Sequence, residues 1–184
     1  KAGDYLYDIV GPLGLATHTE GLKKVAVIGG GVGCAIALPV ARALKENGCH
    51  VTSVIGFRSR DLVILEDEFR AVSDELIIMT DDGSYGEKAF TTDKLKELIA
   101  AGNQYDEIIA VGPPIMMKFV CQIAAENNIP SVASLTAYMI DGTGMCGGCR
   151  LTLNVDGKRV TKFACVDGPE FDGHKVDFAE LMSR

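Results

Sequence analysis

The chain has 184 residues, 47% of them hydrophobic and 21 of them glycine, which allows one packed domain with a small appendage and excludes two full-sized domains. Its formal net charge of −7 disfavours nucleic acid as a partner, because affinity for a polyanion depends on many Lys and Arg contacts to phosphate. No apolar stretch approaches the roughly 20 residues that span a bilayer and no charged-then-apolar leader opens the chain, so we expect a cytoplasmic protein without membrane insertion.

The first segment alternates like a strand over Asp4–Val10. The alternation stops at Gly11, Pro12, Leu13 and Gly14. A strand with no partner within reach, in a chain without an initiator Met, is more typical of the last strand of a preceding domain. We therefore expect residues 1–20 to be the exit segment of a domain that this sequence lacks.

Residues 21–135 alternate between apolar strands and helical stretches. Strands separated by helices pair in parallel with right-handed crossovers, and the carboxyl ends of such strands form a ligand crevice. We therefore expect an α/β, Rossmann-like domain over these residues. The expected strands are Val25–Ile28, His50–Ile55, Glu75–Met79, Glu107–Val111 and Ser131–Leu135, and the expected helices are Cys34–Glu46, Leu62–Val72, Lys94–Ala101 and Pro114–Asn127.

A glycine-rich loop joins the first strand to the first helix, which is the context in which such a loop binds a dinucleotide. Its residues are Gly29, Gly30, Gly31, Val32 and Gly33. Without side chains the backbone can turn tightly and approach a pyrophosphate, whose charge is met by N–H groups at the start of the helix. A plain strand-to-helix turn is the alternative, but such a turn rarely needs four glycines in five residues.

The residues after the second and third strands do not decide whether the nucleotide is NAD or NADP. The acidic residue that usually holds the ribose hydroxyls of NAD is missing after the second strand, where Arg58 and Arg60 could meet the 2′-phosphate of NADP. Two solvated loop arginines are the alternative. After the third strand, Asp81, Asp82 and Ser84 could bind nucleotide hydroxyls, with an ordinary polar loop as the alternative.

The pattern changes after residue 135, where an irregular glycine-rich stretch precedes two short alternating segments. Leu151–Val155 and Arg159–Ala164 flank Asp156-Gly157, a residue pair typical of a hairpin turn. We expect residues 136–184 to form a small β appendage. Three cysteines crowd into it, whereas the scattered Cys34, Cys49 and Cys121 are expected to be packed core thiols.

The clustered cysteines have the spacing of an iron-sulfur site. Asp141, Cys146, Cys149 and Cys165 form the pattern D-x4-C-x2-C-x15-C, whereas plant-type [2Fe-2S] sites use C-x4-C-x2-C and a distant fourth cysteine. Asp141 occupies the place of the first cysteine, so three thiolates and one carboxylate are predicted to hold two irons. A structural zinc site is the main alternative, although zinc sites are usually completed by Cys or His, and His174 lies outside the spacing. A redox dithiol at Cys146 and Cys149 is the third possibility, after the cluster and the zinc site.

The order of these motifs carries a resemblance that covers nearly the whole chain. The motifs are Gly11–Gly14, Gly29–Gly33, Asp81–Ser84, Val111–Met116, Cys146–Cys149 and Cys165–Pro169. They resemble the small subunits of NADH-dependent ferredoxin:NADP reductase and sulfide dehydrogenase, in the ferredoxin-NADP reductase superfamily. The dihydroorotate dehydrogenase electron-transfer subunit is the nearest related family, and it normally has Cys where Asp141 stands.

The resemblance implies three cofactors: a [2Fe-2S] cluster, FAD, and NAD(H) or NADP(H). The FAD would be bound mainly by an N-terminal β-barrel that this sequence lacks, and Gly11 to Gly14 would approach the flavin. Gly112, Pro113 and Met116 would border the nicotinamide, from which hydride passes to FAD and then single electrons pass to the cluster. No protein side chain is predicted to act as a catalytic base.

The resemblance also implies a partner: a larger flavin and iron-sulfur subunit of a hetero-oligomeric reductase, with ferredoxin reached through that subunit. In this family the small subunit typically works with NAD(H), which conflicts with Arg58 and Arg60 and keeps the nucleotide open. Two other functions also stay open. One is a dihydroorotate dehydrogenase or hydrogenase diaphorase subunit, and the other is a non-redox nucleotide-binding module with structural zinc.

Overall fold

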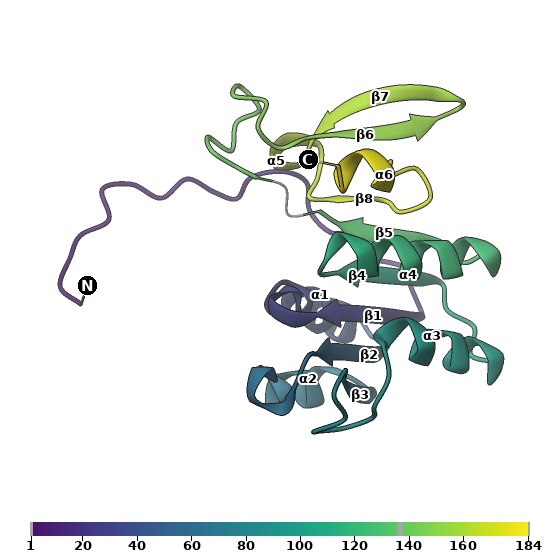
Figure 1. Cartoon of the computed structure of the whole chain (residues 1–184). Coiled ribbons are helices and arrows are strands. Elements are labelled where there is room, and N and C mark those ends of the chain that lie inside the picture. The colour runs from purple at the N-terminus through teal and green to yellow at the C-terminus, as the bar shows by residue number, and fades with distance from the viewer. Residues whose placement is uncertain (1, 136–137, 184) are drawn as a thin grey trace.

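A computed structural model, which describes residues 2–135 and 138–183, shows a six-stranded sheet at the centre of the chain (Figure 1). The strand order is β3-β2-β1-β4-β5-β8; β1 to β5 are parallel and β8 runs antiparallel to β5. The Rossmann-like sheet expected from the sequence is therefore confirmed. The strands are β1 (Lys24–Gly30), β2 (His50–Phe57), β3 (Glu75–Thr80), β4 (Glu107–Val111), β5 (Ser131–Ser134) and β8 (Glu170–Asp172).

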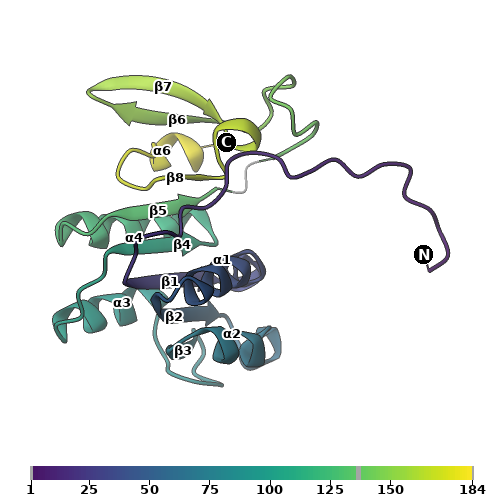
Figure 2. The same cartoon turned by 180° about the vertical axis from the view of Figure 1, so that it is seen from behind.

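Helices cover both faces of this sheet (Figures 1 and 2). The helices α1 (Cys34–Glu46) and α2 (Glu66–Val72) share one core, and α3 (Thr91–Ala100) and α4 (Pro114–Glu126) share the other. The helix predicted to start at Leu62 starts four residues later, after the short 3₁₀ turn η2 (Arg60–Leu62). Leu65 has a left-handed φ of 60°, which no right-handed helix contains, so the helix can begin only after it.

The strands send apolar side chains into both of these cores. In β1, Val25 and Val27 pack with residues of α1, whereas Ala26 and Ile28 pack with residues of α3 and α4. All four side chains are fully buried. A continuous apolar run of this kind is typical of a parallel strand covered on both faces. The two cores hold the sheet from both sides and so fix its carboxyl edge.

Residues 2–13 form an extended arm that leaves the body of the molecule (Figures 1 and 2). The prediction of a strand over Asp4–Val10 is wrong, because no strand occurs within these described residues. A strand needs a neighbour for its backbone hydrogen bonds, and the side chains of Tyr5 and Tyr7 are instead fully exposed. The arm meets the body at Leu15, whose N–H donates to Gly168 O at 2.7 Å.

The C-terminal part contains a hairpin and also contributes a strand to the main sheet. The hairpin strands β6 (Arg150–Val155) and β7 (Lys158–Phe163) flank Asp156 and Gly157, whose φ values of +50° and +74° fit the expected turn. The strand β8 was not expected from the sequence, and its pairing with β5 attaches the appendage to the six-stranded sheet. The short helices α5 (Ala164–Asp167) and α6 (Phe178–Leu181) complete this part.

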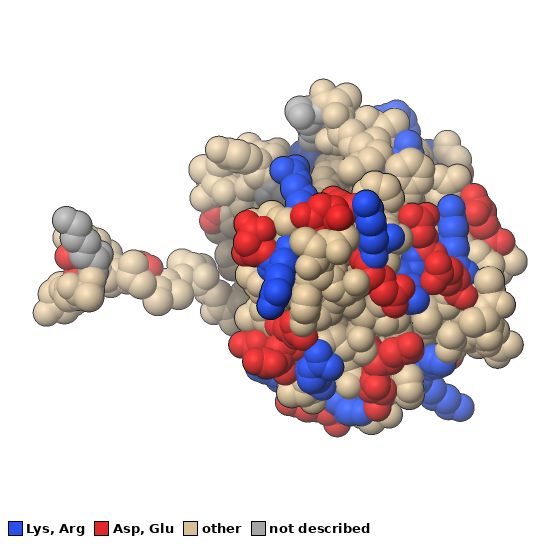
Figure 3. All heavy atoms as spheres, turned by 60° about the horizontal axis from the view of Figure 1, so that its bottom comes forward, with Lys and Arg blue, Asp and Glu red and all other residues tan. Residues whose placement is uncertain are grey.

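The charged surface is mixed on the face that Figure 3 presents, where acidic and basic side chains are interspersed rather than gathered by sign. The arm that projects from this view carries mainly uncharged side chains. Among the helices of the described residues, none has both the length and the apolar character that crossing a bilayer requires.

Candidate functional site

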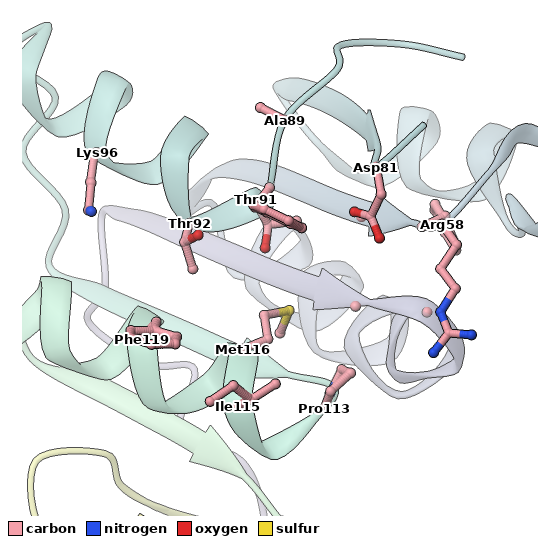
Figure 4. A pocket seen from close by; sticks show the side chains of 15 residues that line it. Arg58, Asp81, Ala89, Thr91, Thr92, Lys96, Pro113, Ile115, Met116 and Phe119 are labelled. Atoms are coloured by element: carbon pink, nitrogen blue, oxygen red, sulfur yellow. The ribbon is translucent and has the colours of Figure 1, made fainter. Parts of the chain in front are cut away.

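A cavity of about 580 Å³ lies at the carboxyl ends of the parallel strands (Figure 4). Its wall is built by residues at the ends of β1, β2, β3 and β4 and by the N-terminal halves of α3 and α4. The strand order reverses between β1 and β4, and ligands of open α/β sheets bind at this reversal. The position of the cavity therefore fits the nucleotide site that the sequence predicts.

The glycines of the first loop have two structural roles. A Cβ on Gly33 would lie 2.7 Å from Val111 O, and one on Gly30 would lie 2.6 Å from Met116 Sδ. At Gly33 the backbone of the turn after β4 leaves no room for a Cβ, whereas at Gly30 a Cβ would meet the side chains of Pro113 and Met116. Gly31 differs, since its φ is +55° and a Cβ there would meet no atom within 4 Å. Gly31 lines the cavity and leaves room for a ligand to reach the backbone.

Three further predicted residues of this region lie outside the cavity wall. A Cβ on Gly29 would lie 2.9 Å from Cys34 Sγ, and one on Gly112 would lie 3.1 Å from Gly30 Cα. Val32 is 82% exposed. The tight packing of Gly29 and Gly112 holds the loop in one conformation, with its backbone at the edge of the cavity.

Arg58 and Asp81 face the cavity from neighbouring strand ends (Figure 4). The N–H of Asp81 donates to Phe57 O at 3.0 Å, and the N–H of Asp82 donates to Arg58 O at 3.2 Å. These backbone bonds extend the pairing of β2 with β3 by two residues. The two residues are thereby held at neighbouring positions of the wall, with the Arg58 guanidinium directed toward the coil that follows β1 (Figure 4).

The structure places the other predicted polar residues of this region outside the wall. The Arg60 guanidinium lies over the Tyr85 ring, 5.3 Å from its centroid, and the Arg60 N–H donates to Ser84 Oγ at 2.8 Å. Ser84 donates to Asp82 Oδ1 through its N–H at 2.9 Å and its hydroxyl at 2.6 Å, which holds the pKa of that carboxyl below its ordinary value. These three side chains stabilise their own loop, and their part in nucleotide binding stays a prediction.

The remaining wall has an apolar side and a polar side (Figure 4). Pro113 and Met116, predicted to border the nicotinamide, line it together with Phe119 of α4. Opposite them lie Thr92 and Lys96 of α3, which were not among the predicted site residues. The available signal was the polar Thr91-Thr92 pair at the start of that helix, but the helix was predicted to begin only at Lys94. The late predicted start left Thr92 in the loop before the helix. Lys96 lay within the predicted helix, but its place on the cavity wall depends on the fold.

The cysteine loop brings two of the four predicted metal ligands into contact. The Sγ atoms of Cys149 and Cys165 are 3.2 Å apart and both residues are buried, whereas Cys146 is exposed. Asp141 accepts hydrogen bonds from the N–H of Thr143 at 2.8 Å and of Cys146 at 2.6 Å. The Thr143 bond, with that of Cys146, holds the pKa of the Asp141 carboxyl below its ordinary value. Asp141 thus shapes the loop that carries Cys146.

The donor set of this loop fits an iron-sulfur cluster. Backbone N–H groups already point at two of the sulfurs, that of Gly148 at Cys146 Sγ and that of Cys165 at Cys149 Sγ, each at 3.4 Å. Such N–H groups support the negative charge of a cluster. Over residues 2–135 and 138–183, however, no three His, Cys, Asp or Glu side chains are gathered closely enough to hold a metal ion. The full ligand set therefore stays a prediction.

The segment predicted to approach the flavin lies against the cysteine loop. A Cβ on Gly14 would clash with Gly168 O, and a Cβ on Gly142 would lie 2.7 Å from Leu13 Cδ1. Gly11 and Pro12, immediately before this contact, are exposed. Leu13 and Gly14 thus link the arm to the loop that carries the cysteines.

Comparison with known proteins gives matches over both halves of the chain. Residues 136–177 match the family model of the iron-sulfur cluster binding domain of dihydroorotate dehydrogenase B. The chain is 49% identical over 184 residues to the dihydroorotate dehydrogenase B (NAD(+)) electron transfer subunit homolog of Thermotoga maritima, covering 100% of this chain and 63% of that protein. It is 33% identical over 178 residues to the dihydroorotate dehydrogenase B (NAD(+)) electron transfer subunit of Clostridium perfringens, covering 96% of this chain and 68% of that protein.

Among solved structures, the chain is similar to one of an NADH-dependent reduced ferredoxin-NADP oxidoreductase, described in connection with flavin-based electron bifurcation. The TM-score is 0.87 at 47% identity, with 98% of this chain and 63% of that chain covered. The chain thus spans just under two thirds of the length of this structure and of the Thermotoga maritima relative.

Proposed function

The chain belongs to the family of dihydroorotate dehydrogenase B electron-transfer subunits and their homologues, and from this premise we propose that it passes electrons between a pyridine dinucleotide, a flavin and an iron-sulfur cluster. The resemblance predicted from the order of motifs is confirmed by these matches. The activity, cofactors and partners of the whole protein are our proposals, because the chain covers 63% of the first relative.

The observation that carries the proposal is the arrangement of three segments along one edge of the molecule. The glycine loop and the turn after β4 form the cavity, β4 pairs with β5, and β5 pairs with β8. The strand β8 follows Cys165 closely in sequence, and Leu13 and Gly14 pack on that same part. A flavin next to Gly11–Gly14 would therefore lie near the cysteine loop, with the nucleotide cavity on the same edge.

Roles in this proposed function follow for the loop glycines, for Pro113 and Met116, and for Gly11–Gly14. When bound, nicotinamide and FAD would supply hydride transfer, and the cluster would supply one-electron transfer. The N–H groups of Gly30 and Gly31 would hold the pyrophosphate, while Pro113 and Met116 would border the nicotinamide. Gly11–Gly14 would approach the flavin, whose main binding domain we place before residues 1–20. Residues 21–135 and 136–184 would be the nucleotide and cluster domains.

For the cluster we propose the [2Fe-2S] type with Asp141, Cys146, Cys149 and Cys165 as ligands. The spacing of these residues supports it, as do the contact between two of the sulfurs and the N–H groups directed at them. We also propose the cytoplasm as the compartment. All six cysteines are free, which suits a reducing environment.

For the assembly we propose an NAD(P)H-dependent reductase of the ferredoxin-NAD(P) type. Its partner would be a larger flavin and iron-sulfur subunit, with ferredoxin reached through that subunit. The 47% identity to the NADH-dependent oxidoreductase over 98% of this chain supports this assignment. A dihydroorotate dehydrogenase complex is the second candidate, supported by the names of the curated relatives.

The proposal is tested on the full-length protein, made and purified without oxygen. We expect two irons and two acid-labile sulfides per chain, no zinc, and a visible thiolate-to-iron absorption that bleaches when NADH or NADPH is added. One zinc per chain, with neither iron nor acid-labile sulfide, would contradict the proposed cluster and leave a nucleotide-binding module with a structural metal.

The role of Asp141 is tested by two substitutions that separate ligation from loop shape. Asp141→Asn keeps an oxygen that accepts the N–H bonds of Thr143 and Cys146 but removes the charge, whereas Asp141→Ala removes both. If Asp141 is a ligand, both variants lose most of their iron or change their visible spectrum. A wild-type spectrum and iron content in Asp141→Asn, with loss only in Asp141→Ala, would show that Asp141 only shapes the loop.

A further inference from the structure

The one-turn helix α5, which contains Cys165, packs against the loop that carries the other predicted cysteine ligands (Figure 1). The Ala164 N–H donates to Cys149 O at 3.2 Å, and the Cys165 N–H points at Cys149 Sγ at 3.4 Å. A Cβ on Gly144 would lie 2.8 Å from Val166 Cγ2. Three consecutive residues of α5 therefore contact the cysteine loop, so the position of this turn fixes where Cys165 lies.

The carboxylate of Asp167 closes this turn. Asp167 is the last residue of α5, yet its Oδ2 accepts a hydrogen bond from the Phe163 N–H, just before the helix, at 2.8 Å. Its Oδ1 accepts from Lys162 Nζ, also at 2.8 Å. A single helical turn has little stability of its own, and a carboxylate is disfavoured at the carboxyl end of a helix. The two bonds of Asp167 offset both costs, and Cys165 lies within the closed turn.

The ion pair also brings two opposite charges close to a predicted cluster ligand. Lys162 and Asp167 lie three and two residues from Cys165, and their side chains are 39% and 27% exposed. The potential of an iron-sulfur cluster depends on nearby charge, because reduction adds a negative charge to it. A carboxylate alone beside Cys165 would oppose reduction, and the Lys162 ammonium offsets it.

We propose that Asp167 is a positioning residue for the iron-sulfur cluster, with Lys162 as its charge partner. The carboxylate holds the turn that carries Cys165, and the ammonium cancels the charge that this carboxylate would place beside the cluster. The assignment rests on the proposed function, because it requires a cluster at the cysteine loop.

The charge role is tested by redox titration of the full-length protein, purified without oxygen, at low ionic strength, where salt screens partly exposed charges least. Asp167→Asn keeps an oxygen for the Phe163 N–H but removes the negative charge, and Lys162→Gln removes the positive one. We expect the first variant to raise the potential and the second to lower it. Each shift should change the ratio of reduced to oxidised cluster about threefold, or about 30 mV for a one-electron couple. The double variant should return close to the wild type.

A second ion pair of the C-terminal part provides matched controls. Lys175 Nζ lies 2.8 Å from Asp172 Oδ2, the same distance as in the proposed pair. Asp172 is paired with Val132 near the start of β5, outside the contacts of α5 with the cysteine loop. Asp172→Asn and Lys175→Gln remove the same charges and should leave the potential unchanged.

The positioning role is tested by the rate at which an iron chelator removes iron. Asp167→Ala removes both hydrogen bonds, and we expect iron release at least about tenfold faster than in the wild type, with Asp167→Asn between the two. Release at the wild-type rate in both variants would overturn the positioning role. The Asp167→Asn variant keeps this test decisive if Asp167→Ala does not fold.

The outcomes separate this assignment from the proposed function. A wild type with neither iron nor acid-labile sulfide would overturn both. A wild type with its cluster, and single variants whose potentials stay unchanged or shift in the same direction, would overturn only the charge role of the pair.

Discussion

The nucleotide half of the chain (residues 24–135) and the cysteine segment (residues 138–183) prepare their sites in different ways. In the nucleotide half, the glycine loop packs against the turn after β4 and an open cavity is already present. In the cysteine segment, the sulfurs of Cys149 and Cys165 contact each other and Cys146 is exposed. The Asp141 carboxylate accepts a backbone hydrogen bond from Cys146. The proposed nucleotide site is therefore built by packing, whereas the proposed cluster site would need its cofactor to gather the four predicted ligands.

This difference follows from what each ligand demands of the chain. A pyrophosphate is held by backbone N–H groups, whose positions are fixed once strand and helix have packed. A cluster is held by thiolates that would lie close together as negative charges, so their gathering depends on the metal. We expect substitutions in the two regions to have separable effects.

The largest expected effect is loss of the cluster without loss of nucleotide binding. Cys165→Ser replaces a sulfur that contacts Cys149, and we expect most of the iron and sulfide to disappear. Affinity for ADP-ribose, measured by calorimetry, should stay at the wild-type value. Cys49→Ser is the control, since Cys49 is a buried cysteine outside the loop and its replacement should retain the iron. Joint loss of iron and nucleotide binding in Cys165→Ser would contradict the separation.

The second-largest expected effect is a loss of stability when a substitution disrupts the packing of the glycine loop. A Cβ at Gly33 would meet backbone atoms of Val111 and Gly112 at 2.7 to 2.9 Å, so Gly33→Ala should lower the free energy of unfolding by about 3 kcal/mol. Gly31→Ala faces open space and should cost only about 1 kcal/mol, from its left-handed φ. Urea unfolding of the two variants compares these costs. Equal losses would show that the loop is not fixed by close packing.

The smallest effect concerns the junction of the two regions. Glu170 of β8 accepts a hydrogen bond from the Thr17 hydroxyl at 2.9 Å, and burial raises the pKa of its carboxyl. A raised folded-state pKa means that the native state loses stability as the pH rises through that value. Glu170→Gln keeps an acceptor oxygen and removes the charge. We expect it to exceed the wild type in stability at about pH 7 by less than about 1 kcal/mol, and to match it at about pH 4, below the unfolded pKa.

Urea unfolding at both pH values measures this difference. If the stability difference between the wild type and Glu170→Gln were the same at both pH values, the Glu170 carboxyl would be as well solvated in the folded protein as in the unfolded chain.

The parallel sheet could be predicted from the sequence because its signals are local. The apolar run Val25–Ile28, the glycines after it and the helix that follows lie next to one another in the chain. The strand β8 could not be predicted in this way, because it has three residues and its partner β5 lies far away in sequence. The expected strand over Asp4–Val10 failed for a related reason, since alternation alone does not supply a neighbour.

The residues of the candidate site likewise divide into those with local sequence signals and those whose positions depend on the fold. Gly30, Gly31 and Pro113 could be predicted as wall residues because their motifs are contiguous in sequence. The position of Arg58 next to Asp81 could not be predicted, since it depends on the register of two strands. Sequence spacing equally could not reveal that Arg60 lies over Tyr85.

The most direct test of the difference between the two regions is the affinity for ADP-ribose of the full-length protein with and without its cluster. The cluster is removed by chelation under reducing conditions, and both forms are titrated by calorimetry. A nucleotide site built by packing alone predicts the same dissociation constant for the two forms. A marked loss of affinity in the cluster-free form would show that the two sites are organised together, and would contradict the account.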